Sequence, residues 1–107
     1  MSENRLEKIL KLSQEEPQNS FLLYALALEY EAIKSHEEAI RTLEKLKAKD
    51  PEYLGLYYTL STFYIQKGEL ERAEEIAKEG IQIALLQQNL KTKMELQGIL
   101  QNLADDE

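Results

Sequence analysis

The side chain best suited to catalysis or metal binding is the single histidine, His36. It opens residues 36–40, HEEAI, which begin like the helix of a zinc protease. Such a helix needs a second histidine four residues later as a zinc ligand, and Ile40 occupies that position here. Since the chain has no cysteine and no other histidine, we expect no zinc site and no thiol chemistry. His36 is instead expected to pack in a turn or to face solvent.

Closely spaced carboxylates are the second candidate for chemistry. They are Glu69, Glu71, Glu74 and Glu75, at the start of an expected helix. Paired carboxylates can perform acid–base catalysis or hold calcium. Acidic side chains also stabilise the positive end of a helix dipole, so we expect a solvated face here. The sequence shows no glycine-rich phosphate loop either. It therefore predicts a protein that is not an enzyme, with no catalytic residue, metal or cofactor.

Composition narrows the possible partners. The chain has 107 residues, 43% hydrophobic and 31% charged, which is typical of one small globular domain. Its formal net charge is −7 and no basic patch is visible, so we expect neither nucleic acid nor an anionic membrane as a partner. No apolar stretch is long enough to span a membrane and no secretory signal is visible, so a cytoplasmic location is expected.

The chain repeats itself with a period of 34 residues. Pro17 and Pro51 lie that far apart, and the same shift places Tyr24 on Tyr58. Further matched pairs are Leu26 and Leu60, Tyr30 and Tyr64, Glu37 and Glu71, and Ala39 and Ala73. The matched positions are mostly apolar and follow helical spacing, so each period predicts two helices.

Start and stop signals place these helices. Ser35 and Glu38 form a predicted capping box, and Gly68 suits a left-handed helix end. Asp50 and Pro51 suit the N-cap and first position of a helix over 52–67. The other expected helices cover 18–33, about 35–49 and about 69–88. The expected single domain, 1–107, comprises a half-repeat helix at 3–15, repeat 1 at 18–51, repeat 2 at 52–88, and a capping helix at 89–104.

This pattern resembles the tetratricopeptide repeat. The family's motif positions hold Leu23, Leu26, Ala27, Tyr30, Ala39, Leu43 and Pro51 in repeat 1, and Tyr57, Leu60, Ser61, Tyr64, Ala73 and Ala77 in repeat 2. The motif has a glycine at the end of the first helix, and Gly68 matches it in repeat 2 whereas Lys34 does not in repeat 1. At the motif's small-residue position in the second helix, Leu46 of repeat 1 is larger than usual and Gly80 of repeat 2 is smaller. The resemblance implies an all-α fold, a short right-handed α–α superhelix of antiparallel helix hairpins, and a function in protein–protein interaction.

In this family the first helix of each repeat lines a concave groove. The resemblance and helical spacing together predict a binding stripe of Phe21, Tyr24, Leu28 and Glu31 in repeat 1, and of Tyr58, Thr62, Ile65 and Gln66 in repeat 2. Residues 21–28 are apolar without a break, and the packing face accounts for only half of them. The rest must be covered by a terminal helix, by a second copy of the chain, or by a ligand.

Some members of this family grip a chaperone's C-terminal carboxylate with basic and amide side chains. The matching positions here hold Tyr24, Leu28 and Thr59, followed by Asn89 and Lys93, so we expect no such ligand. The expected function is a scaffold that binds an apolar peptide or helix of another protein in its groove. The alternative is a homo-oligomeric assembly protein, such as a homodimer, that uses the same apolar surface on itself.

Overall fold

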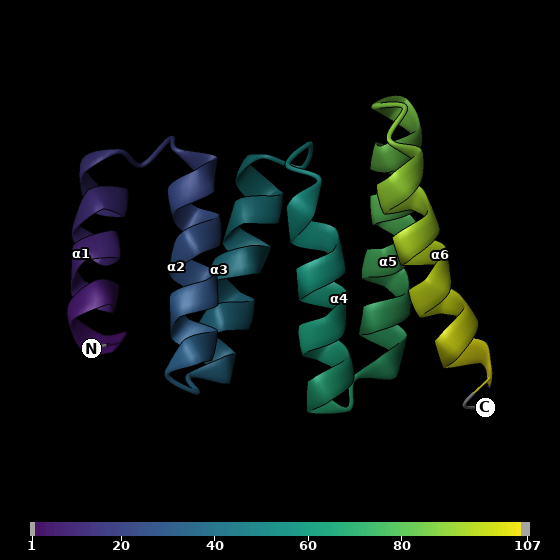
Figure 1. Ribbon diagram of the computed structural model, residues 1–107, viewed down its shortest axis with the longest axis horizontal. Helices are drawn as coiled ribbons and strands as arrows, with labels where there is room; N and C mark the ends of the chain where they lie inside the picture. The colour runs from purple at the N-terminus through teal and green to yellow at the C-terminus, as the bar shows by residue number, and fades with distance from the viewer. Residues whose placement is uncertain (1, 106–107) are drawn as a thin grey trace. The chain divides into compact units, whose positions relative to one another are not determined.

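The computed structural model describes residues 2–105, and within them every regular element is an α-helix, which confirms the all-α prediction. Residues 1, 106 and 107 of the expected domain lie outside the described residues. The helices, labelled in Figure 1, are α1 (Ser2–Glu15), α2 (Ser20–Ala32), α3 (His36–Lys49), α4 (Gly55–Lys67), α5 (Leu70–Leu86) and α6 (Leu90–Asp105).

The chain forms two compact units, Met1–Tyr53 and Leu54–Glu107, here called unit 1 and unit 2. In unit 1, α2 packs against both α1 and α3; in unit 2, α5 packs against both α4 and α6. Figure 1 shows the chain reversing direction between successive helices of each unit. Unit 1 contains predicted repeat 1 and one terminal helix, and unit 2 contains predicted repeat 2 without residues 52 and 53, together with the other terminal helix.

The predicted packing positions form the two cores. Leu23, Leu26 and Ala27 of α2 are buried, and they face a partner helix whose buried residues include Ala39, Ile40, Leu43 and Leu46. Tyr30 is only half-buried. In unit 2 the fully buried side chains include Tyr57, Leu60, Ser61, Ile76 and Leu96. The Ser61 hydroxyl donates to the carbonyl of Ala73 at 2.8 Å, so this buried polar group ties α4 to α5.

The helix over 52–67 was predicted too long at its start, because α4 begins at Gly55. Asp50 does not cap it: the Asp50 carboxylate accepts a hydrogen bond from the Ser20 hydroxyl at 2.6 Å, and its carbonyl accepts from the Tyr53 N–H. Pro51 therefore occupies the second position of a four-residue turn, where its fixed φ is favourable. Pro17 does the same, since the Asn19 N–H donates to the Glu16 carbonyl.

Two further helix starts differ from expectation in detail. Ser35 lies at the N-cap of α3, as predicted, but its side chain makes no capping hydrogen bond, so the capping box is absent. Asn19 instead caps α2: its side-chain oxygen accepts from the Leu22 N–H at 3.2 Å. That cap makes α2 begin at Ser20 rather than at residue 18.

Three hairpin turns end their first helix in the same way. A left-handed residue lies one or two positions after each helix end, with φ of 66° at Lys34, 87° at Gly68 and 56° at Gln88. In each turn the N–H groups of the left-handed residue and of the residue after it donate to carbonyls of the last helical turn, as from Gly68 to Ile65 and from Glu69 to Tyr64. Gly68 was predicted for this role; Lys34 and Gln88 adopt the same conformation with a side chain attached, at a steric cost.

Replacing Lys34 with glycine is therefore expected to stabilise the protein. The substitution removes the Cβ from a left-handed residue and should raise the free energy of unfolding by about 0.5–1 kcal/mol. Urea unfolding followed by circular dichroism measures it. Gly68→Lys is the reverse exchange at the equivalent position and should lower stability. A Lys34→Gly protein that unfolds at lower urea than the parent would contradict this account.

Candidate protein-binding surface

The four predicted stripe residues of unit 1 all lie outside its buried core. Phe21 is 64% exposed and Leu28 is 41% exposed, while Tyr24 and Glu31 are half-buried. The residues between them that face the core, Leu23, Leu26 and Ala27, are buried. The helix therefore presents a second apolar side in addition to its packing side.

The terminal helix α1 covers only part of α2. It packs against α2, and the Arg5 guanidinium donates from Nε to Oε1 of the buried Glu29 at 3.0 Å. This ion pair joins the two helices and had no signal in the sequence pattern. Phe21 and Leu28 nevertheless keep 64% and 41% of their surface exposed, so α1 does not cover these two side chains.

Tyr24 belongs to an aromatic pair. Its ring centre lies 5.5 Å from that of Tyr53, with the two planes tilted by 42°, a favourable arrangement for aromatic rings. Burial raises the pKa of the Tyr53 phenol, and the neighbouring Tyr24 and Asp50 raise it further. Tyr24 is thus partly a structural residue that holds the turn after α3, as well as a stripe residue.

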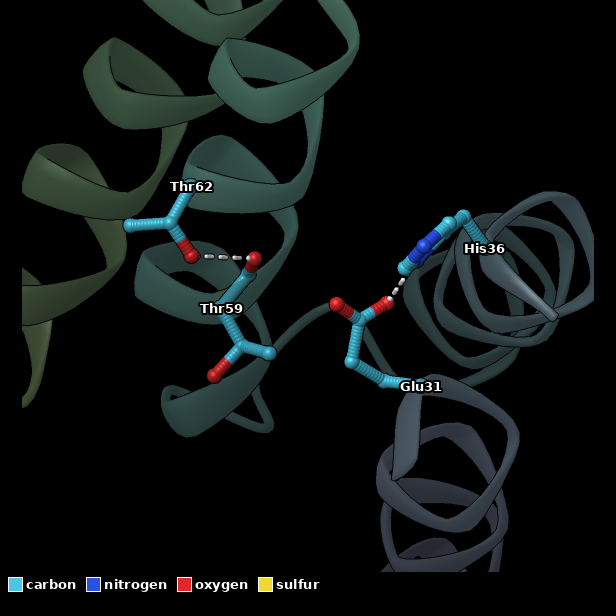
Figure 2. Close-up of polar contacts among 4 residues, drawn as sticks. All are labelled: Glu31, His36, Thr59 and Thr62. Carbon is cyan, nitrogen blue, oxygen red and sulfur yellow. Dashed lines mark hydrogen bonds and ion pairs between the residues drawn. The ribbon is translucent and has the colours of Figure 1, made fainter. Parts of the chain in front are cut away.

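Glu31 is held in place by the turn that follows α2. Nδ1 of His36 lies 2.7 Å from Oε1 of Glu31, and Figure 2 shows the imidazole directed at the carboxylate. The His36 ring itself is largely exposed, with 60% of its side-chain surface accessible. The only histidine of the chain therefore orients an acidic stripe residue, a contact that the sequence analysis missed.

The stripe of unit 2 is more polar. Tyr58 is 43% exposed, Thr62 and Ile65 are half-buried, and Gln66 is exposed. The Thr62 hydroxyl donates to the carbonyl of Thr59 at 2.8 Å, within the same helix (Figure 2). This bond satisfies the hydroxyl locally, so Tyr58 and Ile65 are the apolar contacts this stripe can offer.

A pocket of about 370 Å³ borders this stripe within unit 2. Tyr58 of α4 lines one side, and the remaining lining residues come from α6: Glu95, Gly98, Ile99 and Asn102. The sequence predicts α6 only as a capping helix. The spacing of Glu95, Gly98 and Asn102, at intervals of three and four, places them on one helix face and is the signal that could have found them.

The acidic start of α5 consists of ion-paired and solvated side chains. Glu69 pairs with Lys67 at 3.0 Å, and Glu75 pairs with Arg72 at 3.1 Å. Among the described side chains, those of residues 4–105, no group of three or more histidine, aspartate or glutamate residues is placed to hold a metal ion. No helix in the described part of the chain is long and apolar enough to cross a membrane.

One apolar cluster was not anticipated. Leu86, Leu90 and Met94 are strongly exposed around the turn between α5 and α6. Leu86 ends α5, while Leu90 and Met94 lie one turn apart at the start of α6. Exposed apolar residues are common on protein surfaces, so these three mark no binding site by themselves.

Comparison with known proteins identifies the same architecture. A family model described as tetratricopeptide repeat matches residues 34–94. The solution structure of a tetratricopeptide repeat domain protein from Salinibacter ruber is 30% identical, with a TM-score of 0.81, over 85% of this chain and 92% of that one. No curated protein matches the sequence.

Two more distant structures share the fold. The type III secretion translocator chaperone SycD from Yersinia enterocolitica, described as an alternative dimer, is 17% identical with a TM-score of 0.77, over 94% of this chain and 80% of that one. The protein MamA is 19% identical with a TM-score of 0.70, over 97% of this chain and 67% of that one. At these identities the likeness concerns the fold alone.

Proposed function

Because this chain belongs to the tetratricopeptide repeat family, we propose that it is a non-enzymatic module and that its stripe on α2 binds an apolar segment of another protein. The fold generally mediates protein–protein interaction. The finer proposal rests on one observation. Residues 21–28 are apolar throughout, and the unit that contains them leaves Phe21 and Leu28 exposed.

The chemistry of the partner follows from that of the stripe. Phe21 and Leu28 lie seven residues apart, about two turns of helix, on one side of α2. An amphipathic helix or short apolar peptide could cover both positions at once. The equivalent stripe of α4 adds Tyr58 and Ile65, and we propose that it contacts apolar groups in the same manner.

The expected result of removing the apolar stripe is loss of the partner. Phe21→Ser with Leu28→Ser should weaken binding at least about tenfold, because each exposed side chain contributes roughly 1–2 kcal/mol when it is buried on binding. Tyr24 is left intact because it also packs on Tyr53. A photo-crosslinking amino acid at position 21 identifies the protein that touches the stripe, and affinity for that protein is then measured for each variant.

A matched control distinguishes specific binding at the stripe from nonspecific hydrophobic association. Leu86→Ser with Leu90→Ser removes two exposed leucines that lie outside both stripes, and it should leave binding unchanged. Circular dichroism checks that both double variants remain helical. Equal loss of affinity in the two variants, or none in the stripe variant, would show that the stripe is not the binding surface.

Self-association through the same stripe is the second candidate. The exposed Phe21 favours it, since homodimers commonly bury self-complementary apolar patches. The SycD structure is described as a dimer, which supports testing the same possibility here. Light scattering over a range of concentrations decides: a strict monomer excludes this candidate, whereas a dimer lost on Phe21→Ser with Leu28→Ser supports it.

A further inference from the structure

The pocket beside Tyr58 in unit 2 has lining groups that suit a cation. Three of its five lining residues carry a side-chain oxygen: the phenol of Tyr58, the carboxylate of Glu95 and the amide of Asn102. Among the described residues, none forms a hydrogen bond or ion pair with the side chains of Glu95 or Asn102. These oxygens are therefore available to an incoming donor.

The charge that lines the pocket is negative. Glu95 is the only charged residue among the five that line it. Residues 55–66 of α4 contain no acidic or basic side chain, and Lys67 at the end of that helix pairs with Glu69. Residues 54–107 together carry nine acidic and five basic side chains, so the wider field also favours a cation.

Gly98 opens the floor of this pocket. A Cβ added there would have no atom within 4 Å, although Gly98 lies in the interior of α6. Glycine inside a helix costs about 1 kcal/mol relative to alanine, and packing within the protein does not require it at this position. Its effect is to leave bare backbone between Glu95 and Asn102, where a long side chain can lie close to the helix.

We propose that this pocket binds an arginine side chain of a partner protein. The methylene stem lies over Gly98 and Ile99, and the planar guanidinium stacks on Tyr58 and donates to the Glu95 carboxylate and the Asn102 oxygen. Arginine fits better than lysine because its flat guanidinium stacks on aromatic rings and pairs with carboxylates through two parallel bonds. The inference rests on the proposed function and names a polar contact that accompanies the apolar stripe contacts.

A small probe tests the pocket independently of any partner. N-acetyl-L-arginine amide is titrated into the ¹⁵N-labelled full chain, and amide chemical shifts are followed by NMR. We expect saturable shifts centred on the backbone amide of Gly98 and the side-chain amide of Asn102. The citrulline analogue, which has the same shape without the charge, should shift these signals far less. Equal shifts with both probes, or no saturable shift at either signal, would overturn the proposal.

Two variants with the same charge change complete the test. Glu95→Gln removes the lining carboxylate, which is exposed, and should weaken probe binding about threefold to fivefold. Glu71→Gln removes one negative charge from α5 outside this pocket and should change it less than about twofold. If the two variants weakened probe binding equally, the net charge of the protein would explain the binding, and the proposal would be overturned. Failure here leaves the stripe on α2 untouched, since Phe21 and Leu28 are tested by crosslinking in the other unit.

Discussion

Replacing Gly80 with alanine is expected to lower the free energy of unfolding by about 2 kcal/mol, because overpacking a filled core typically costs 1–3 kcal/mol. A Cβ at this position would lie 2.6 Å from Cβ of Tyr57 and 2.8 Å from Cδ1 of Leu96. Both neighbours are almost fully buried and one of the clashing atoms lies next to the backbone, so neither can simply move aside. Urea unfolding of the full chain measures the loss.

The matched control is Gly98, the other glycine in the interior of a helix of the same unit. Gly98→Ala adds the same methyl group where no atom lies within 4 Å, so it should raise stability by about 0.5–1 kcal/mol. The two identical exchanges therefore have opposite predicted signs. Tyr57→Leu introduced together with Gly80→Ala should recover part of the loss by making room. Two glycine variants that shift stability in the same direction would refute the packing argument.

Leu46→Ala is expected to destabilise the protein by about 3 kcal/mol, within the 2–5 kcal/mol typical of a leucine truncated in a core. Leu46 is fully buried in α3 and occupies the place that Gly80 occupies 34 residues later. The same shift relates Leu23 to Tyr57, so a leucine pair in unit 1 stands where unit 2 has a large ring over a glycine. With alanine at position 46, the smaller Leu23 side chain does not fill the space that Leu46 leaves in the way that the Tyr57 ring fills the space over Gly80 in unit 2.

Thermal and urea unfolding measure this second effect. Leu12→Ala is the control, because Leu12 lies in α1 and is 42% exposed, and its truncation should cost less than about 1 kcal/mol. If Leu46→Ala cost no more than Leu12→Ala, repeat 1 would not be packed through the position that the 34-residue shift assigns to it.

The helix pattern was predictable because it depends on spacing within one stretch of chain. Leu23, Leu26 and Ala27 recur at helical intervals in α2, as do Ala39 and Leu43 in α3, and Gly68 marks a helix end by its own backbone preference. The start of α4 was not predictable in the same way. Asp50 and Pro51 suit a helix start locally, but the Ser20 hydroxyl, 30 residues earlier, binds the Asp50 carboxylate in the folded unit.

The candidate site was likewise predictable only where it depends on spacing within one helix. Helical spacing predicts which side chains share a face, and it therefore selected Phe21, Leu28 and Tyr58, all of which are exposed. Helical spacing does not determine which residues of other helices lie opposite that face. The pocket on α6 exists because Tyr58 faces Glu95, 37 residues later in the chain, and the contact between Glu31 and His36 depends on the geometry of a turn.

The pairing of helices within each unit has a consequence for how the chain folds. Its main helix contacts join neighbours along the sequence: α1 with α2, α2 with α3, α4 with α5, and α5 with α6. Contacts between near neighbours close short loops, which costs little chain entropy and favours rapid folding. A nascent chain can therefore complete the packing of unit 1 while residues of unit 2 are still being added at the ribosome.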